Sequence, residues 1–368
     1  MSDDSNDNAK QGFTTKIVHH DRRRGVEHGA VHKPVHTSVA FGYETTAELE
    51  AVFQGRQSGY SYGRQSNPTI DALETKITEM EGGLRSVCFG TGMAAIGTTF
   101  FALLREGDHV VSSAYLFGNT NSLFNSFDAQ GLAVSFVDAT SVDAVADALQ
   151  QNTRLVFVET IANPRTQVTA LAEIGELCRA RGLIYVVDNT MTSPYLFQPK
   201  DVQASLVVNS LTKYIGGHGN ALGGVVTEMG HYDWSSFANI YDTYQTGDAQ
   251  LWGITQIKKK GLRDFGASLA PEAAHHIAVG SETLSLRMDR QCENAQALAE
   301  YLDAHPRIGK VYYPGLPNHP EHERARALFK AYGAILSFEL AAGVDTSAFM
   351  DRLRVIIRST NLGDNRTL

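Results

Sequence analysis

The feature of this sequence that most constrains its fold is a regular alternation between residues 86 and 224. Short β-branched and apolar runs, each a strand candidate, recur at 109–113, 133–137, 155–158, 183–187 and 204–208. Amphipathic stretches lie between them at 141–151 and 171–181, and Gly182 is a suitable residue to end the second as a helix. Alternating strands and helices are typical of βαβ units. We therefore predict an α/β protein with a mostly parallel sheet flanked by helices.

Changes in composition and periodicity divide the chain into three parts. Residues 1–60 are rich in His, Arg and Gly with little periodicity, which predicts an arm that contacts a neighbouring subunit. Residues 61–260 contain the alternating pattern and form a large domain. Residues 261–368 begin with a long predicted helix over 271–305 and continue with mixed strands and helices, which indicates a smaller α+β domain. A length of 368 residues fits more than one hydrophobic core.

Charge and composition exclude several classes of function. The net charge of −8 argues against binding to the phosphate backbone of a nucleic acid. No apolar run approaches the ~18 residues of a membrane helix, and residues 1–10 lack the apolar core of a secretory signal. We therefore predict a cytoplasmic protein that binds no membrane. The cysteines are too widely spaced for a disulfide framework or a zinc site and are predicted to be buried free thiols: Cys88, Cys178 and Cys292.

Two histidine pairs are the remaining candidates for a metal site. His19 precedes His20, and His275 precedes His276. Adjacent side chains on a helix or strand point apart, so surface or interface roles are favoured for these residues. We predict no metal.

Two acidic residues follow strand candidates, where open α/β sheets place their ligands. Glu159 ends one apolar run and Asp188 ends another. Ordinary capping explains one such acid, but two on adjacent strand ends call for a cation, since an unpaired buried carboxylate costs several kcal/mol. A protonated pyridine nitrogen is a suitable cation. The amides of the nearby segment Phe-Gly-Thr-Gly-Met at 89–93 would either hold a phosphate at a helix start or form a turn without a ligand.

Lys213 follows the strand candidate at 204–208, within the segment Asn-Ser-Leu-Thr-Lys-Tyr at 209–214. A lysine in such a place is normally a surface residue. The hydroxyls of Ser210 and Thr212 suit a phosphate, however, and a desolvated lysine is a competent Schiff-base amine. The residues alone therefore leave two roles open for Lys213, a surface lysine or a Schiff-base lysine.

From about residue 60 to 368 the chain resembles the Cys/Met-metabolism family of pyridoxal-phosphate enzymes. The family includes cystathionine γ-synthase, cystathionine lyases, methionine γ-lyase and homoserine sulfhydrylases. The motifs that carry the resemblance are Tyr-Gly-Arg at 62–64 before Asn-Pro-Thr at 67–69, Gly-Thr-Gly-Met at 90–93, Phe-Gly-Asn-Thr at 117–120, Glu159 with Asn163 and Pro164, Asp-Asn-Thr at 188–190, and Ser-Leu-Thr-Lys at 210–213. The resemblance implies a fold-type I transferase with a seven-stranded sheet in its large domain.

The resemblance also implies a site for the cofactor pyridoxal 5'-phosphate. In it, Lys213 forms the Schiff base, Asp188 pairs with the ring nitrogen and keeps the ring an electron sink, Asn163 contacts the ring hydroxyl, and Phe117 stacks on the ring. The remaining residues hold the phosphate, and the last two come from a neighbouring subunit: Gly92, Met93, Ser210, Thr212, Tyr62 and Arg64. A shared site implies a homo-oligomer, an obligate dimer that is usually paired into a tetramer.

Departures from the family pattern favour the sulfhydrylases. Phe117 stands where many members have a tyrosine, and Asn119 stands where methionine γ-lyases usually have a cysteine. The segment from Asn361 and Leu362 to Arg366 resembles the sulfhydrylase form, in which an arginine could attract the carboxylate of a succinyl group. We therefore expect γ-replacement on an O-acylhomoserine, an amino-acid substrate, with sulfide to give homocysteine.

Two alternatives remain open. The first is cystathionine γ-synthase or γ-lyase activity, including methionine γ-lyase activity, on a related sulfur amino acid. The second is a non-catalytic scaffold of the same fold in which Lys213 is structural. Colour distinguishes an enzyme with a bound cofactor from such a scaffold.

The family continues beyond the position of Leu368 with an arginine that binds the substrate's α-carboxylate. No earlier position in the chain matches the Arg-x-Ser-Val-Gly-like setting of that arginine. The part 261–368 is therefore expected to be truncated. A chain that truly lacks the arginine is expected to bind the cofactor with badly impaired turnover, because the bidentate grip on the carboxylate orients the substrate.

Overall fold

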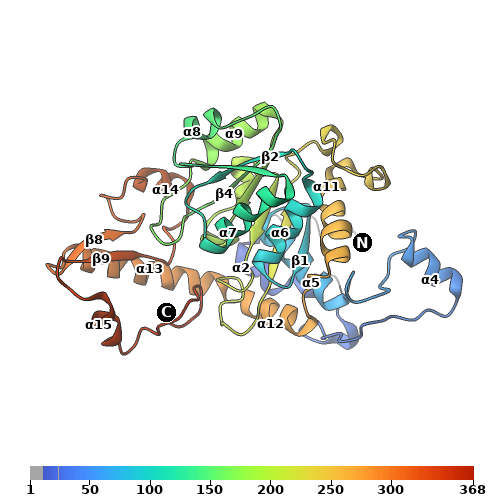
Figure 1. Ribbon diagram of the computed structural model, residues 1–368. Coiled ribbons are helices and arrows are strands. Elements are labelled where there is room, and N and C mark those ends of the chain that lie inside the picture. Colours follow the sequence, from blue (N-terminus) through green and yellow to red (C-terminus); the bar gives the residue numbers. More distant parts are fainter. Residues whose placement is uncertain (1–10, 24) are drawn as a thin grey trace.

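The computed structural model describes residues 11–23 and 25–368. At its centre lies a seven-stranded sheet in the order β1-β7-β6-β5-β4-β2-β3 (Figure 1). Its strands are β1 (Arg85–Phe89), β2 (His109–Ser113), β3 (Ala133–Val137), β4 (Thr153–Glu159), β5 (Ile184–Asp188), β6 (Leu206–Asn209) and β7 (Gly224–Glu228). The pairings from β3 to β6 are parallel, whereas β7 is antiparallel to both of its neighbours. The prediction of a mostly parallel seven-stranded sheet is confirmed.

Helices cover both faces of this sheet because neighbouring strand residues point to opposite sides. Val110 of β2 packs with α6 (Gly92–Leu103), α7 (Gly118–Ser126) and α11 (Trp252–Gln256) on one face. Val111 packs on the other face, which α8 (Val142–Asp147) and α9 (Leu171–Arg181) cover. Helix α5 (Pro68–Glu81) covers that same face beneath β1 and β7. The result is a three-layer α/β/α body in which the central strands are buried on both sides and the edge strand β3 is partly exposed.

Local signals set the bounds of these helices. Thr91 caps α6 by accepting a hydrogen bond from the amide of Ala94 at 3.0 Å, and Ser141 caps α8 in the same way. Helix α9 ends at Gly182, which adopts the left-handed conformation with φ of 64°. The predicted helix over 171–181 therefore has the bounds that the sequence indicated.

The predicted helix over 271–305 is two helices, α12 (Pro271–Ser281) and α13 (Leu284–Asp303). The break follows Gly280, whose carbonyl accepts hydrogen bonds from the Thr283 hydroxyl at 3.2 Å and the Arg287 guanidinium at 2.9 Å. A methyl group at Gly280 would lie 2.0 Å from the carbonyl oxygen of Gly216. The prediction of one continuous helix was wrong, because at the break the Gly280 carbonyl accepts these side-chain bonds from the start of the next helix.

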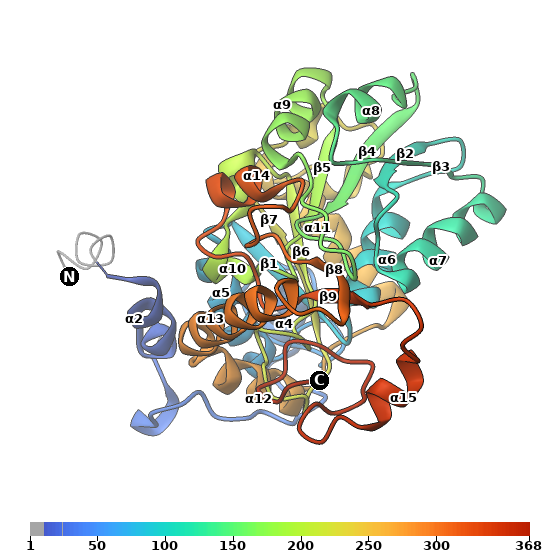
Figure 2. The same cartoon turned by 90° about the vertical axis from the view of Figure 1, so that its left-hand side faces the viewer.

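The C-terminal part packs along α13, as the orange and red ribbon shows in Figure 2. Here β8 (Ile308–Tyr312) and β9 (Ser337–Leu340) form an antiparallel pair. Val311 and Tyr313 pack with Ala295 and Ala299 of α13 in a small separate core. Helices α14 (His322–Leu328) and α15 (Thr346–Asp351) complete this part, and α10 (Ser193–Leu196) contacts α13 from the body.

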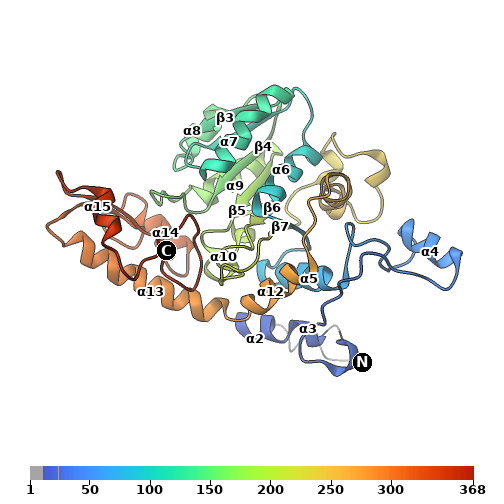
Figure 3. The ribbon, with the colours of Figure 1, turned by 60° about the horizontal axis from the view of Figure 1, so that its bottom comes forward.

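The N-terminal segment has two different surroundings. Helices α2 (Phe13–Val18) and α3 (His20–Arg23) lie against α5 of the same chain, near the bottom of the view in Figure 3. In Figure 1, by contrast, α4 (Thr46–Phe53) stands away from the body. Phe53 of this helix is 70% exposed, and Val39, in the segment that precedes the helix, is 62% exposed.

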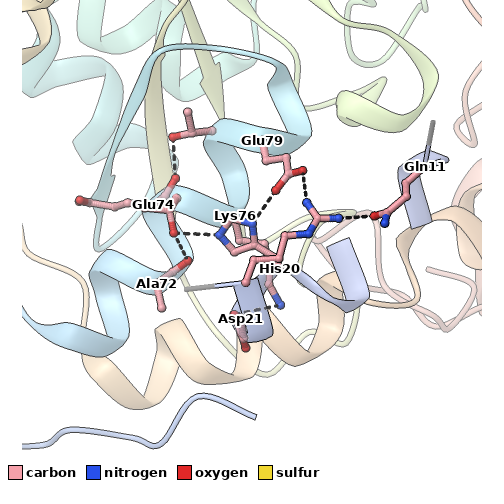
Figure 4. A network of polar contacts seen from close by, with 10 residues as sticks. Gln11, His20, Asp21, Ala72, Glu74, Lys76 and Glu79 are labelled. Atoms are coloured by element: carbon pink, nitrogen blue, oxygen red, sulfur yellow. Dashed lines mark hydrogen bonds and ion pairs between the residues drawn. The ribbon is translucent and has the colours of Figure 1, made fainter. Parts of the chain in front are cut away.

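Ion pairs and hydrogen bonds fasten α3 to α5 (Figure 4). His20 contacts Glu79 at 2.7 Å and the Thr75 hydroxyl at 2.9 Å, and Arg23 also bonds to Glu79 at 2.7 Å. Lys76, which is 1% exposed, lies 3.8 Å from Asp21. The surface or interface role predicted for His20 was therefore wrong, because the ring is 5% exposed and held between two side chains of α5.

The sequence predictions also concerned cysteines, metal sites, membrane helices and a secretory signal. Cys88, Cys178 and Cys292 are buried free thiols, as predicted. In residues 11–23 and 25–368 no three His, Cys, Asp or Glu side chains gather into a metal-ligating group. Within the same ranges, no helix has the length and apolarity needed to cross a membrane. The prediction that residues 1–10 are not a secretory signal lies outside the described residues.

Candidate active site

Two carboxyl groups lie side by side at the carboxyl ends of β4 and β5. Glu159 and Asp188 are register partners in the parallel pairing of these strands. Glu159 is 6% exposed and accepts a hydrogen bond from the amide of Phe117 at 2.7 Å, whereas Asp188 accepts one from the amide of Thr190 at 2.9 Å. Burial raises the pKa of Glu159, and the adjacent Asp188 raises it further. Burial also raises the pKa of Asp188, and the two bonds from Thr190 oppose that change.

Lys213 stands in the segment that leaves β6 beside these acids. Its Nζ donates a hydrogen bond to Oδ1 of Asn361 at 2.7 Å, across 148 residues of chain. Burial lowers the pKa of Lys213, so a larger fraction of the amine is in the neutral, nucleophilic form than for an exposed lysine. Gly363 packs against the same turn, since a methyl group there would lie 3.1 Å from Cα of Lys213.

The start of α6 meets the segment after β6 at one point. A methyl group on Gly92 would lie 2.9 Å from Cβ and 3.2 Å from Oγ of Ser210. The first amides of a helix have no partner within the helix, so those of Gly92 and Met93 are available donors beside that hydroxyl. The Thr212 hydroxyl bonds to the backbone of Gly223, accepting from its amide at 3.0 Å.

Thr190 links these two groups of residues, and the sequence reasoning missed it. Its amide donates to Asp188, and its Oγ1 accepts a hydrogen bond from the amide of Ser210 at 2.8 Å. The motif Asp-Asn-Thr at 188–190 contained the signal, because a hydroxyl two residues beyond a strand-end acid can contact the neighbouring strand.

Phe117 and Asn163 flank the strand-end acids. Phe117 precedes α7, is 44% exposed, and is held by its amide bond to Glu159. Asn163 follows β4 in a turn where Ile161 pairs with Val168. The structure thus brings Phe117 to Glu159 as an anchored but exposed ring, which is the arrangement that a stacking role requires.

Tyr62 and Arg64 lie in a different environment. The Arg64 guanidinium is 5.5 Å from the centre of the Tyr62 ring and donates to the carbonyl of Arg263. Tyr62 is 44% exposed. Among the described residues, neither side chain forms a hydrogen bond or a ring contact with Lys213 or Asp188.

The three predicted substrate residues have distinct surroundings. Asn361 holds the Lys213 amine, a contact that the sequence did not indicate. Leu362 packs into the core beside the site. The Arg366 side chain is 61% exposed and bonds to Asp364 at 3.1 Å.

The residues at the strand ends fit pyridoxal phosphate. The Asp188 carboxylate is desolvated by burial. Among the described residues it has no ion-pair partner, and the protonated ring nitrogen of the cofactor would supply one. Gly92 leaves the space beside Ser210 that a side chain would fill. Lys213 has the partly desolvated amine needed to bind an aldehyde. The fold and these residues together define a pyridoxal-phosphate enzyme.

Comparisons with known proteins identify the family. The model described as Cys/Met metabolism PLP-dependent enzyme matches residues 14–368. The chain belongs to this family, and it depends on pyridoxal phosphate.

Relatives with different activities have the same sequence identity to this chain. An L-methionine gamma-lyase from Fusobacterium nucleatum subsp. polymorphum is 35% identical over 98% of this chain and 86% of the relative. An O-succinylhomoserine sulfhydrylase from Pseudomonas aeruginosa is 35% identical over 96% of this chain and 83% of its own length. A solved Campylobacter jejuni structure with N'-pyridoxyl-lysine-5'-monophosphate has a TM-score of 0.91 at 27% identity, covering 97% of this chain and 91% of that one. These relatives establish an enzyme of sulfur amino-acid metabolism.

Two deeply buried glutamates lead to an expected pH dependence of stability. Burial raises the pKa of Glu81 to about 7 and that of Glu228 to about 8, from 4.5 in the unfolded chain. The folded state then binds more protons than the unfolded state, so the free energy of unfolding falls as the pH rises. Buried histidines such as His319, whose pKa burial lowers to about 4, change stability mainly below pH ~6.5.

We therefore expect the Tm of the cofactor-free chain to fall between pH ~6.5 and ~8. Differential scanning calorimetry at several pH values checks this expectation. Glu228→Gln removes one of the titrating groups and is expected to make the decline shallower. A Tm that rises across this range would contradict the expectation.

Proposed function

We propose that the chain catalyses γ-replacement on an O-acylhomoserine, with sulfide as the second substrate and homocysteine as the product. The observation that carries the proposal is the Lys213 amine, whose pKa burial lowers and which an uncharged side chain, Asn361, holds at 2.7 Å. A neutral amine on a flexible stem can move protons between neighbouring carbons of one substrate. That capacity is what replacement at the γ-carbon requires.

The residues of the site have separate tasks in this proposal. When bound, pyridoxal phosphate withdraws electrons from the α-carbon of the substrate. Lys213 then removes the α-proton and relays protons at the β-carbon. Asp188 keeps a negative charge opposite the ring nitrogen, and Phe117 limits the cofactor on one face. The acyl group leaves the γ-carbon as a carboxylate, and sulfide forms the new carbon–sulfur bond there.

The competing activity is γ-elimination to an oxo acid and ammonia. A methionine gamma-lyase and a succinylhomoserine sulfhydrylase have equal sequence identity to this chain. Both activities are therefore tested. Acylhomoserine is supplied to the enzyme with and without sulfide, and homocysteine and oxo acid are both measured. Homocysteine that replaces oxo acid as sulfide increases supports γ-replacement, whereas oxo-acid release that sulfide leaves unchanged contradicts it. Cystathionine γ-synthase activity would appear as cystathionine formation when cysteine replaces sulfide.

Arg366 is the residue we propose to bind the succinyl carboxylate. Its side chain is mostly exposed and its Nη1 bonds to Asp364 and Asn365, so Nε and Nη2 offer donors for a second carboxylate. Arg366→Ala is expected to raise the KM for O-succinylhomoserine about tenfold, with little effect on O-acetylhomoserine. Arg366→Lys is the matched control that retains the charge. An unchanged KM for the succinyl substrate in Arg366→Ala would remove the basis for this role.

We also propose that Tyr62 and Arg64 complete the site of a neighbouring subunit in a dimer of dimers. The exposure of the Tyr62 ring, 44%, and the packing of the Arg64 guanidinium against it support this arrangement. Arg64→Ala and Lys213→Ala are each expected to be inactive alone. Mixed dimers keep one intact site, so unfolding and refolding a 1:1 mixture is expected to restore about a quarter of the parent activity. A mixture that stays inactive, although the subunits exchange, would contradict a shared site.

A further inference from the structure

Glu81 is a fully buried carboxylate directly beneath the candidate cofactor site. It is the last residue of α5 and is 0% exposed. Its Oε1 accepts hydrogen bonds from Nδ2 of Asn209 at 2.6 Å and from Nδ2 of Asn189 at 3.2 Å. Both asparagine side chains are themselves fully buried. One carboxylate therefore ties together the ends of two neighbouring strands.

The two asparagines are the sequence neighbours of proposed cofactor ligands. Asn189 follows Asp188 at the end of β5, and Asn209 precedes Ser210 at the end of β6. Successive residues of an extended chain point to opposite sides. Asp188 and Ser210 can thus face the cofactor while Asn189 and Asn209 point toward α5.

Pyridoxal phosphate has a planar ring, and different residues must contact its ring nitrogen and the phosphate on its short methylene arm. The protein must therefore hold Asp188 and Ser210 at a fixed separation, and small errors in such spacing are costly. The backbone bond from Asn189 to Val208 at 2.8 Å and the bond from Ser210 to Thr190 at 2.8 Å join the strands on the site side. Glu81 joins them on the opposite side.

We infer that Glu81 is a positioning residue that fixes the separation of Asp188 and Ser210, and thereby sets the affinity for pyridoxal phosphate. The inference rests on the cofactor roles proposed above for Asp188 and Ser210. Burying a carboxylate is costly, and an apolar side chain of the same volume would usually fill this space with less penalty. A carboxylate at this place bonds to both asparagines, which an apolar side chain could not do, and so joins the two ligand-bearing strands.

The test compares Glu81 with Glu228, an equally buried carboxylate at the other end of the sheet. Glu228 is 0% exposed, pairs with Leu206 at the start of β6, and accepts from the Trp234 indole at 2.9 Å. Removing either carboxylate is expected to lower the Tm of the cofactor-free chain. Only the removal of Glu81 is expected to disturb the cofactor ligands.

The dissociation constant for pyridoxal phosphate is measured by absorbance titration of the cofactor-free proteins, together with their Tm. Glu81→Ala is expected to raise the dissociation constant about tenfold or more, whereas Glu228→Ala changes it less than about twofold. Glu81→Gln keeps an acceptor oxygen for the asparagines and is expected to stay within about threefold of the parent. Equal changes in Glu81→Ala and Glu228→Ala, or a parent-like value in Glu81→Ala, would overturn the inference.

A second variant keeps the test decisive if Glu81→Ala does not fold. Asn209→Ala removes the 2.6 Å bond alone and is expected to weaken cofactor binding in the same direction. Parent-like binding by that variant would also overturn the inference. Failure of the cofactor roles proposed for Asp188 and Ser210 is recognised separately, because Asp188→Asn and Ser210→Ala would then bind the cofactor as the parent does, and failure of γ-replacement is recognised by the sulfide assay.

Discussion

Replacing Lys213 by alanine is expected to abolish both the visible absorption band of the purified protein and its activity. The amine is the group that binds the cofactor aldehyde and moves the substrate protons in the proposed mechanism. Its loss removes covalent attachment and general base catalysis together, so kcat/KM should fall by about 10⁴-fold or more. The absorption spectrum and the sulfide-dependent assay measure the two effects independently. The parent band should also disappear on borohydride reduction, which Lys213→Ala cannot show.

Lys259→Ala is the matched control for this variant. Lys259 is also a partly buried lysine whose pKa burial lowers, but it lies in the helical turn from Ile257 to Arg263. Its replacement should leave the protein yellow. A Lys213→Ala protein that keeps the parent's band would contradict the assignment of the cofactor lysine. A Lys213→Ala protein that keeps the parent's activity would also contradict this assignment.

Replacing Asp188 by asparagine is expected to have opposite effects on activity and stability. Asparagine keeps an acceptor for the Thr190 amide but cannot hold a proton on the ring nitrogen by charge. Activity should therefore fall by about 10²- to 10³-fold, the range typical of a lost electrostatic contact in a reaction site. Because burial raises the pKa of Asp188, removal of its charge should raise the Tm of the cofactor-free chain at neutral pH.

Asp108→Asn provides the comparison at the other end of the sheet. Asp108 is 5% exposed and pairs with Arg154 at 2.8 Å. Its replacement should lower the Tm, because the ion pair is lost, and leave the spectrum of the bound cofactor unchanged. If Asp188→Asn instead lowers the Tm and retains activity, Asp188 is a structural residue.

Short-range sequence signals determine some elements of this fold, and these elements could be predicted. The predicted strands at 109–113 and 133–137 coincide with β2 and β3, because β-branched runs between turn residues determine them locally. The helix over 171–181 was predictable for the same reason, since Gly182 ends it. The strand-end positions of Glu159, Asp188 and Lys213 followed from the strands.

Contacts between distant segments could not be predicted in this way. Gly280, just before the break between α12 and α13, packs closely against Gly216, a contact that no local pattern records. The bond between Lys213 and Asn361 joins residues 148 positions apart. The burial of Glu81 between two asparagines likewise depends on the packing of α5 beneath β1 and β7, although its sequence is that of an ordinary helix end.

The reversed direction of β7 restricts how the lysine segment can evolve. A parallel successor to β6 would require a crossover, which carries the chain away from the site over a dozen or more residues. Because β7 is antiparallel to β6, residues 210–223 start and end at the same edge of the sheet, and Gly223 bonds back to Thr212. Insertions and deletions should therefore accumulate in crossovers such as that between β2 and β3, while the length of 210–223 changes little among homologues that keep the lysine.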